Sequence, residues 1–110
     1  MKYIIPQDKV DKIVFKYLDL KRLEKRKPSF YEGMAFAYPD EKYGILGWKK
    51  DGTLYIYHGL IHEIKSTFGM DESNSKSVIG RWVSDRYQLE VRNTASGVRF
   101  FLGKLAIDTN

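Results

Sequence analysis

The chain has 110 residues, a length that suits a single domain spanning residues 1–110. Hydrophobic residues make up 43% of it and sixteen residues are aromatic, which argues against disorder. It contains no cysteine, so disulfide frameworks, thiolate zinc sites and cysteine nucleophiles are excluded. No apolar run reaches the roughly 20 residues that span a bilayer, and the first residues lack the pattern of a signal peptide. We therefore expect a cytoplasmic protein that does not insert into a membrane.

The net charge of +5 is concentrated at the start of the sequence. Residues 1–27 contain nine Lys or Arg against four acidic residues, whereas the remaining 83 residues contain ten of each sign. The density is highest in KRLEKRK at 21–27. Two interpretations remain open: these cations offset the negative end of a helix dipole, or they form a patch that binds phosphate backbones.

A helix is predicted first, over residues 6–24. Pro6 suits the first turn, and apolar residues such as Val10, Val14 and Leu18 follow helical spacing. Pro28 is expected to prevent the helix from continuing, which leaves its basic end free.

Residues 29–57 change to the alternating pattern of strands and predict a three-stranded antiparallel meander. Its turns are expected at 39–42 and at Asp51-Gly52, a pair that favours a type I′ hairpin. One face of this meander should be apolar.

Helical spacing returns over 60–68 and again over 74–87. Leu89 and Val91 then alternate with the apolar residues of 98–102 across a five-residue loop at 93–97, which predicts a C-terminal β-hairpin. The predicted fold class is therefore α+β.

Gly80 interrupts the second of these helices. A glycine inside a helix costs about 1 kcal/mol relative to alanine, so a close approach by another part of the chain or by a ligand is expected there. Packing is the favoured explanation.

Residues 60–102 have the order of a winged helix-turn-helix, in which the second helix enters the major groove of DNA. In this arrangement Lys76 and Arg81 face the groove, and Arg92 or Arg99 on the hairpin reaches a phosphate. Combined with the basic segment, the candidate nucleic-acid-binding residues are Lys21, Arg22, Lys25, Arg26, Lys27, Lys76, Arg81 and Arg92. The alternative is that two helices simply pack on a sheet, because residues 58–104 have a net charge of only +2 and the turn contains Asp71 and Glu72.

The aromatic residues of the meander offer another possible surface for nucleic acid, because unpaired bases stack on aromatic rings beside basic residues. The aromatic residues concerned are Tyr31, Phe36, Tyr38, Tyr43, Trp48, Tyr55 and Tyr57, and the basic neighbours are Lys42, Lys49 and Lys50. Packing between strands is the favoured role for these rings.

Patterns for metal binding and catalysis are weak. His58 and His62 share helical spacing, but two ligands do not hold zinc. A nuclease pattern of Pro39-Asp40 and Glu63-Ile64-Lys65 is rejected, because these residues are predicted in a turn and on a helix. We expect no metal, no cofactor and no enzymatic activity.

The segments VFKYLDL (14–20), DGTLYIYHGLIHEI (51–64) and SKSVIGRWVSDRYQLEV (75–91) resemble short, uncharacterised proteins of marine bacteriophages and ocean metagenomes. The resemblance implies no established activity and no site residue. It favours small accessory roles, such as binding a host protein, binding nucleic acid or joining the virion, in the cytoplasm of the host cell.

The sequence thus predicts a small non-catalytic binding module with DNA or RNA as its partner. The alternative is a protein-interaction or assembly module that uses a sheet edge or an aromatic face to contact a host or phage protein. The oligomeric state is not predicted.

Overall fold

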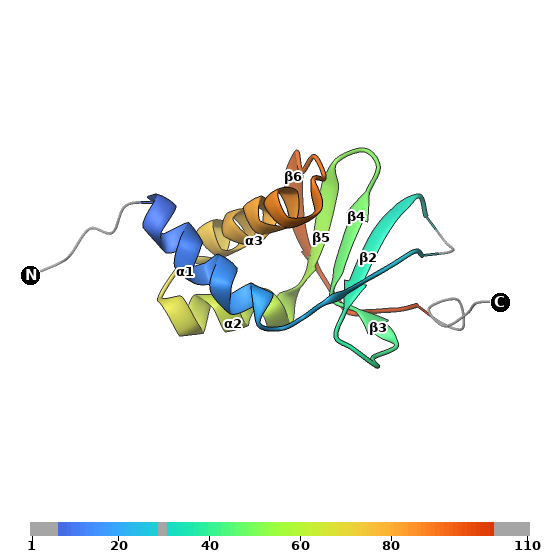
Figure 1. Ribbon diagram of the computed structural model, residues 1–110, viewed down its shortest axis with the longest axis horizontal. Helices are drawn as coiled ribbons and strands as arrows, with labels where there is room; N and C mark the ends of the chain where they lie inside the picture. The colour runs from blue at the N-terminus through green and yellow to red at the C-terminus, as the bar shows by residue number, and fades with distance from the viewer. Residues whose placement is uncertain (1–6, 29–30, 103–110) are drawn as a thin grey trace, which may run out of the picture.

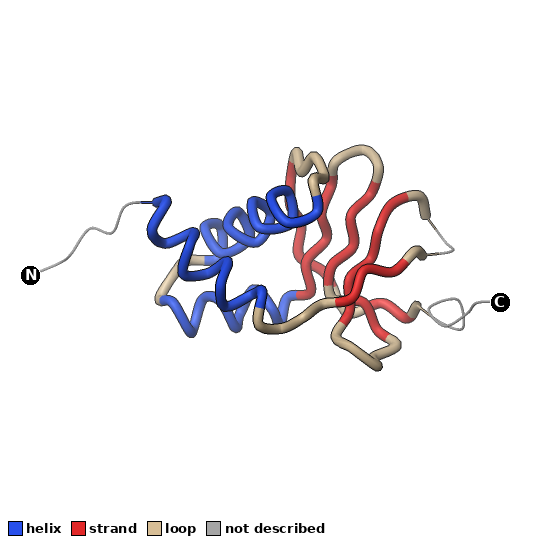
Figure 2. Tube along the Cα trace, in the orientation of Figure 1, coloured by secondary structure: helices blue, strands red, loops and turns tan. Residues whose placement is uncertain are grey.

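The computed structural model describes residues 7–28 and 31–102, and it has the predicted α+β class (Figure 1). In chain order its elements are α1 (Gln7–Asp19), β1 (Glu24–Arg26), β2 (Gly33–Ala37), β3 (Tyr43–Gly44), β4 (Leu46–Lys49), β5 (Thr53–Tyr57), α2 (His58–Phe68), α3 (Glu72–Tyr87), β6 (Asn93–Gly97) and β7 (Phe100–Phe101). The three helices gather at one end of the molecule and the strands at the other (Figures 1 and 2).

Five strands form the main sheet, in the order β1-β2-β4-β5-β6. β2, β4 and β5 pair antiparallel, so the predicted meander is the centre of a larger sheet. The turn between β4 and β5 contains Asp51 and Gly52 as expected, but it is not of type I′, because that turn needs a positive φ at both residues and only Gly52 has one, at +97°. The Asp51 carboxylate accepts a hydrogen bond from the Thr53 amide at 2.9 Å. This turn fixes the register of the two strands that it joins.

The predicted C-terminal hairpin is wrong. Residues 93–97, expected as its loop, form β6, which pairs parallel with β5 from Thr53 opposite Asn93 to Tyr57 opposite Gly97. β7 pairs antiparallel with β3 in a separate two-stranded sheet. Parallel neighbours require a long crossover connection, and α2 and α3 supply it. The wing of the expected winged helix is therefore absent from the described residues.

The first helix is also shorter than predicted, because α1 ends at Asp19 and not at residue 24. Leu20 and Lys21 form a turn, and Arg22 takes a positive φ of 53° that ends the helical path. β1 follows and pairs with β2. Part of the basic segment therefore lies on an edge strand, and the expected free helix end is not formed.

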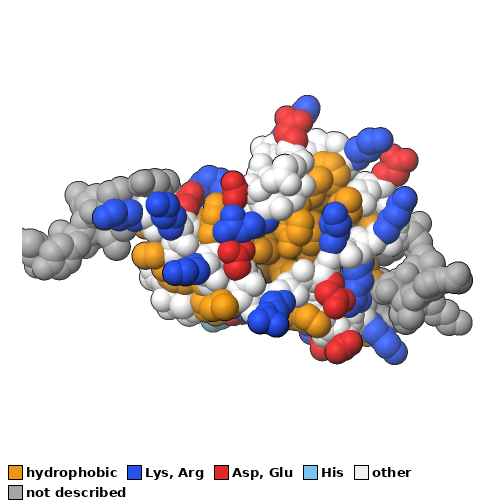
Figure 3. Space-filling view, in the orientation of Figure 1, with side chains coloured by type: hydrophobic (Ala, Val, Ile, Leu, Met, Phe, Trp, Pro, Cys, Tyr) orange, Lys and Arg blue, Asp and Glu red, His pale blue; other side chains and the backbone are white. Residues whose placement is uncertain are grey.

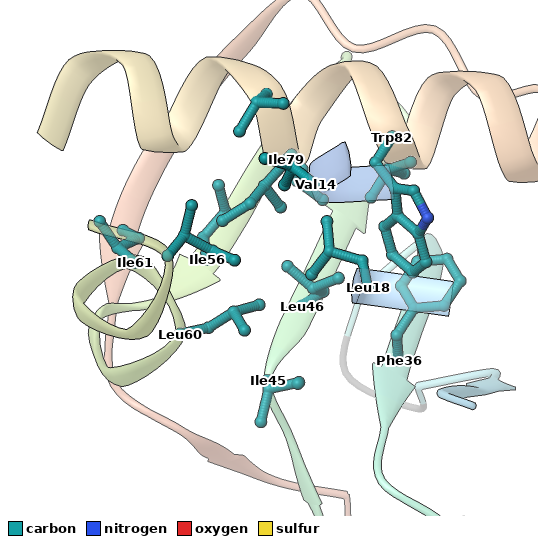
Figure 4. Close-up of a cluster of buried hydrophobic side chains, with 14 residues drawn as sticks. Val14, Leu18, Phe36, Ile45, Leu46, Ile56, Leu60, Ile61, Ile79 and Trp82 are labelled. Carbon is teal, nitrogen blue, oxygen red and sulfur yellow. The ribbon is translucent and has the colours of Figure 1, made fainter. Parts of the chain in front are cut away.

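The main core lies between the helices and the sheet (Figure 4). Val78, Ile79 and Trp82 of α3 are 0%, 0% and 2% exposed, so the apolar side of this helix forms part of the core. A Cβ on Gly80 would lie 3.2 Å from the Thr94 side chain. α3 and β6 thus pack closely at this glycine, as the packing explanation requires.

Among residues 7–28 and 31–102, no helix is both long and apolar enough to cross a membrane.

Candidate nucleic-acid interface

The basic residues proposed from the sequence do not form one surface. On the face drawn in Figure 3, basic side chains are spread widely with acidic ones between them. The contacts of each residue therefore decide which positive charges are available to a ligand.

Lys21 is engaged inside the protein. Its Nζ lies 2.6 Å from Glu63 Oε2, its side chain is only 15% exposed, and Tyr17 donates a hydrogen bond to the same carboxylate. Burial lowers the pKa of Lys21, but the hydrogen bond and charge of Glu63 outweigh this and leave that pKa raised. Lys21 therefore stays charged and fixes the end of α1 to α2.

Arg26 is engaged as well. Its side chain is 12% exposed, and its guanidinium donates to the carbonyl oxygens of Tyr38 and Glu41 and, at 2.8 Å, to the Glu24 carboxylate. These bonds hold β1 against the turn that follows β2. Arg22, by contrast, lies exposed in the turn after α1.

Arg81 and Arg92, predicted on a recognition helix and a wing, do line one hollow between α3 and β6. Each faces a carboxylate: Arg81 makes two hydrogen bonds to Asp11, at 2.7 and 2.9 Å, and Arg92 lies 3.2 Å from Glu90. Lys76, on the same helix, is 4.0 Å from Glu72. The structure thus brings two predicted residues together at a hollow whose charge is largely balanced.

A second hollow, which we call the basic groove, lies along β1, β2 and β4 and has a volume of about 570 Å³. Its lining residues are Lys25, Arg26, Lys27, Glu32, Gly33, Met34, Trp48 and Lys50. Lys25, Lys27 and Lys50 are exposed. Within the described part of the chain, neither Lys25 nor Lys27 has an ion pair. Lys50 forms one with Glu32, which also lines the groove, but the two groups are 4.0 Å apart and both side chains are largely exposed. Such a pair is weak, so all three lysines are available to an anionic ligand.

The floor of the basic groove is apolar and fixed in place. Met34 and Trp48 lie opposite each other on β2 and β4, and both are half-buried against the main core. The Trp48 indole N–H donates to the Glu90 carbonyl at 2.8 Å, which fixes the orientation of the ring. The basic groove therefore has the Trp48 ring in its floor and lysines along its edges.

The sequence predicts the parts of this groove separately. It places Lys25 and Lys27 near the end of a helix, and Trp48 and Lys50 on an aromatic strand surface. The pairing of β1 with β2 unites the two sets, and the charged segment EKR has no strand pattern from which that pairing could be predicted.

The histidines and the rejected nuclease pattern also have defined positions. His58 and His62 both lie on α2, and the described residues contain no group of three or more potential metal ligands. Asp40 lies in a turn with a φ of +67°, whereas Glu63 lies on α2 bound to Lys21. Among the described residues, no hydrogen bond or ion pair connects Asp40 with Glu63 or Lys65.

Comparisons with protein-family models, with curated proteins and with solved structures found no match to this chain.

Proposed function

We propose that this protein is a non-catalytic module that binds single-stranded nucleic acid in the basic groove. The observation that carries the proposal is the placement of three exposed lysines, Lys25, Lys27 and Lys50, around the apolar floor formed by Trp48 and Met34. Single strands are bound by surfaces of this composition, where cations follow the phosphates and bases stack on aromatic rings.

The groove favours a single strand over a duplex for a physical reason. A base in a duplex is already stacked on both sides, so it cannot lie on Trp48 without being unstacked first. An unpaired base has a free face, and stacking on an aromatic side chain is worth about 1 to 3 kcal/mol per base.

Binding of duplex DNA through α2 and α3 is less favoured than binding of a single strand in the basic groove. It needs Arg81 to contact a base edge, and the Arg81 guanidinium already makes two hydrogen bonds to Asp11. Breaking that pair on binding would give up both of these hydrogen bonds and would reduce the gain.

Tryptophan fluorescence gives a direct test. Trp82 is 2% exposed, so quenching by added oligothymidine (dT12) reports contact with Trp48, the other of the two tryptophans. If three phosphates are neutralised, log affinity falls with log salt with a slope of about −2.1, which is roughly a 20-fold loss between 50 and 200 mM salt.

A charge-matched pair of variants separates specific contacts from net charge. Replacement of Lys25, Lys27 and Lys50 by Gln should abolish most of the salt dependence. The control replaces three exposed lysines of α1 by Gln, namely Lys9, Lys12 and Lys16. Equal loss of affinity in both triple variants would mean that only net charge matters, and it would contradict the proposal.

The competing class is a protein-interaction or assembly module, as a phage accessory or structural protein. Its best support is β6, which ends the strand order and pairs only with β5 among the described residues. Such an edge accepts a strand from another chain. This class takes precedence if wild-type protein leaves dT12 unbound at 50 mM salt and if a duplex competitor also fails to bind.

A further inference from the structure

A third hollow lies on the sheet face that points away from the helices. It has a volume of about 390 Å³ and is lined by Tyr31, Lys49, Tyr55, Gly97, Val98 and Phe100, together with Gly47. Tyr55 is 39% exposed and Val98 is 73% exposed, so apolar surface is open to solvent here. We call this hollow the aromatic pocket.

Lys49 supplies the positive charge of the aromatic pocket. Its Nζ lies 5.9 Å from the centre of the Tyr31 ring and 5.2 Å from that of Tyr55. No carboxylate lies within ion-pair distance of Lys49 in the described chain. A ligand with a flat apolar part and an anionic part therefore matches the pocket, since the rings suit the first part and Lys49 the second.

The aromatic pocket and the basic groove meet at one rim of the sheet. Successive residues of a strand point to opposite faces, so Trp48 points into the groove and Lys49 into the pocket. On the neighbouring chain segment, Tyr31 lines the pocket and Glu32 lines the groove. The Lys50 amide donates to the Glu32 carbonyl at 3.1 Å and closes the rim between the two hollows.

We propose that a bound single strand crosses this rim and places a further base in the aromatic pocket, with Lys49 beside its phosphate. The inference rests on the proposed function and extends it from one site to two. Lysines mark the whole route, because Lys50 lies on the groove side of the rim and Lys49 on the pocket side. Each additional stacked base adds affinity, so two sites make binding depend on strand length.

Gly97 allows the aromatic pocket to be blocked without disturbing the fold. A Cβ at Gly97 would meet no atom within 4 Å, and its φ is not positive. Gly97→Val therefore adds a side chain to the open space of the pocket. The matched control is Ser96→Val, which adds similar bulk to an exposed neighbour whose side chain points to the opposite face.

The experiment measures the affinity of dT4 and dT12 by Trp48 quenching and by the anisotropy of labelled oligonucleotides at 50 mM salt. Wild type should bind dT12 at least about 30-fold more tightly than dT4, beyond the roughly ninefold that the nine registers of a three-phosphate site supply on dT12. Gly97→Val and Tyr55→Ala should remove this excess and leave dT4 binding unchanged, whereas Ser96→Val should have no effect. Circular dichroism confirms that each variant is folded.

Three outcomes overturn the inference, and they are distinguishable. If Gly97→Val and Tyr55→Ala bind dT12 as wild type does, the pocket is not used, while the basic groove stands. If they weaken dT4 and dT12 equally, the pocket is not a second site for a longer strand. If wild type binds neither oligonucleotide, the proposed function fails as well.

Discussion

The helical end of the molecule and the basic groove use their positive charges in opposite ways. At the helical end, cations face acids across element boundaries: Lys21 meets Glu63, Arg81 meets Asp11, and Arg86 makes two hydrogen bonds to Asp19 at 2.8 Å. In the basic groove, Lys25 and Lys27 have no ion pair among the described residues, and Lys50 has only an exposed one, 4.0 Å from Glu32.

This difference separates cations that hold the fold together from cations that remain free to bind. A density of Lys and Arg in the sequence does not distinguish the two, because the acids that neutralise them come from distant segments. We therefore expect substitutions of charged residues at the helical end to change stability, and substitutions in the basic groove to change binding.

The largest expected effect separates the two tryptophans. Trp82→Ala removes a side chain that is 2% exposed and should lower the free energy of unfolding by about 3 to 5 kcal/mol in urea titrations. Trp48→Ala, at a half-buried position, should cost only about 1 to 2 kcal/mol but remove oligonucleotide binding. A loss below about 1 kcal/mol for Trp82→Ala would show that this tryptophan is not part of the core.

Two lysines of the basic segment should behave in opposite ways. Lys21→Met removes a hydrogen-bonded partner of the Glu63 carboxylate and should cost about 1 to 3 kcal/mol of stability, with no change in the salt dependence of binding. Lys27→Met, at an exposed position, should change stability by less than about 0.5 kcal/mol and reduce the salt slope by about 0.7. The reverse pattern would contradict the division between the two regions.

Asp19 should give the helical end a specific response to acid. Its hydrogen bond from Arg86 lowers the pKa of the carboxyl, with a further contribution from the Trp82 indole N–H at 2.9 Å. A lowered pKa in the folded state means that the stabilisation is complete above the unfolded pKa, near pH 4, and is lost as pH falls below it. The side chain is 41% exposed, so the loss should stay under about 1 kcal/mol.

The control for this pH effect is Asp19→Asn, which keeps an acceptor for the Trp82 indole but removes the charge. Urea titrations from pH 7 to pH 3 should show a smaller loss of stability for the variant than for wild type. Parallel curves would show that Asp19 does not carry the effect.

The smallest effect concerns the contact between α3 and β6. Gly80→Ala gains helix propensity of about 1 kcal/mol but places a Cβ 3.2 Å from the Thr94 methyl group, so the net change should lie within about 0.5 kcal/mol. In a Thr94→Ser background that methyl group is absent, and Gly80→Ala should then increase the melting temperature. A large loss in both backgrounds would mean that Val91, 3.4 Å away, sets the limit at this contact.

The elements that depend on local patterns could be predicted from the sequence. α2 and α3 begin within two residues of their predicted starts, and β2, β4 and β5 lie inside the predicted meander. In each case apolar spacing and turn residues specify the element within a few positions.

Elements that depend on distant partners could not be predicted. The segment NTASG of β6 consists of residues typical of turns, and it is a strand because β5 offers it a parallel edge. β1 is a strand for the same kind of reason, since EKR pairs with β2 despite its three charges. Because the basic groove depends on β1, the sequence predicts its residues as two separate features, the basic segment after the first helix and the aromatic surface of the meander.

The parallel pairing of β6 with β5 also has a consequence for folding kinetics. Thr53 and Asn93 face each other although forty positions separate them in the chain, so closing this pair costs more loop entropy than forming the hairpin of β4 and β5. During synthesis β5 leaves the ribosome well before β6. Until β6 arrives, the edge of the segment TLYIY is unpaired and open to strands of other nascent chains, so slow translation through α2 and α3 should increase aggregation.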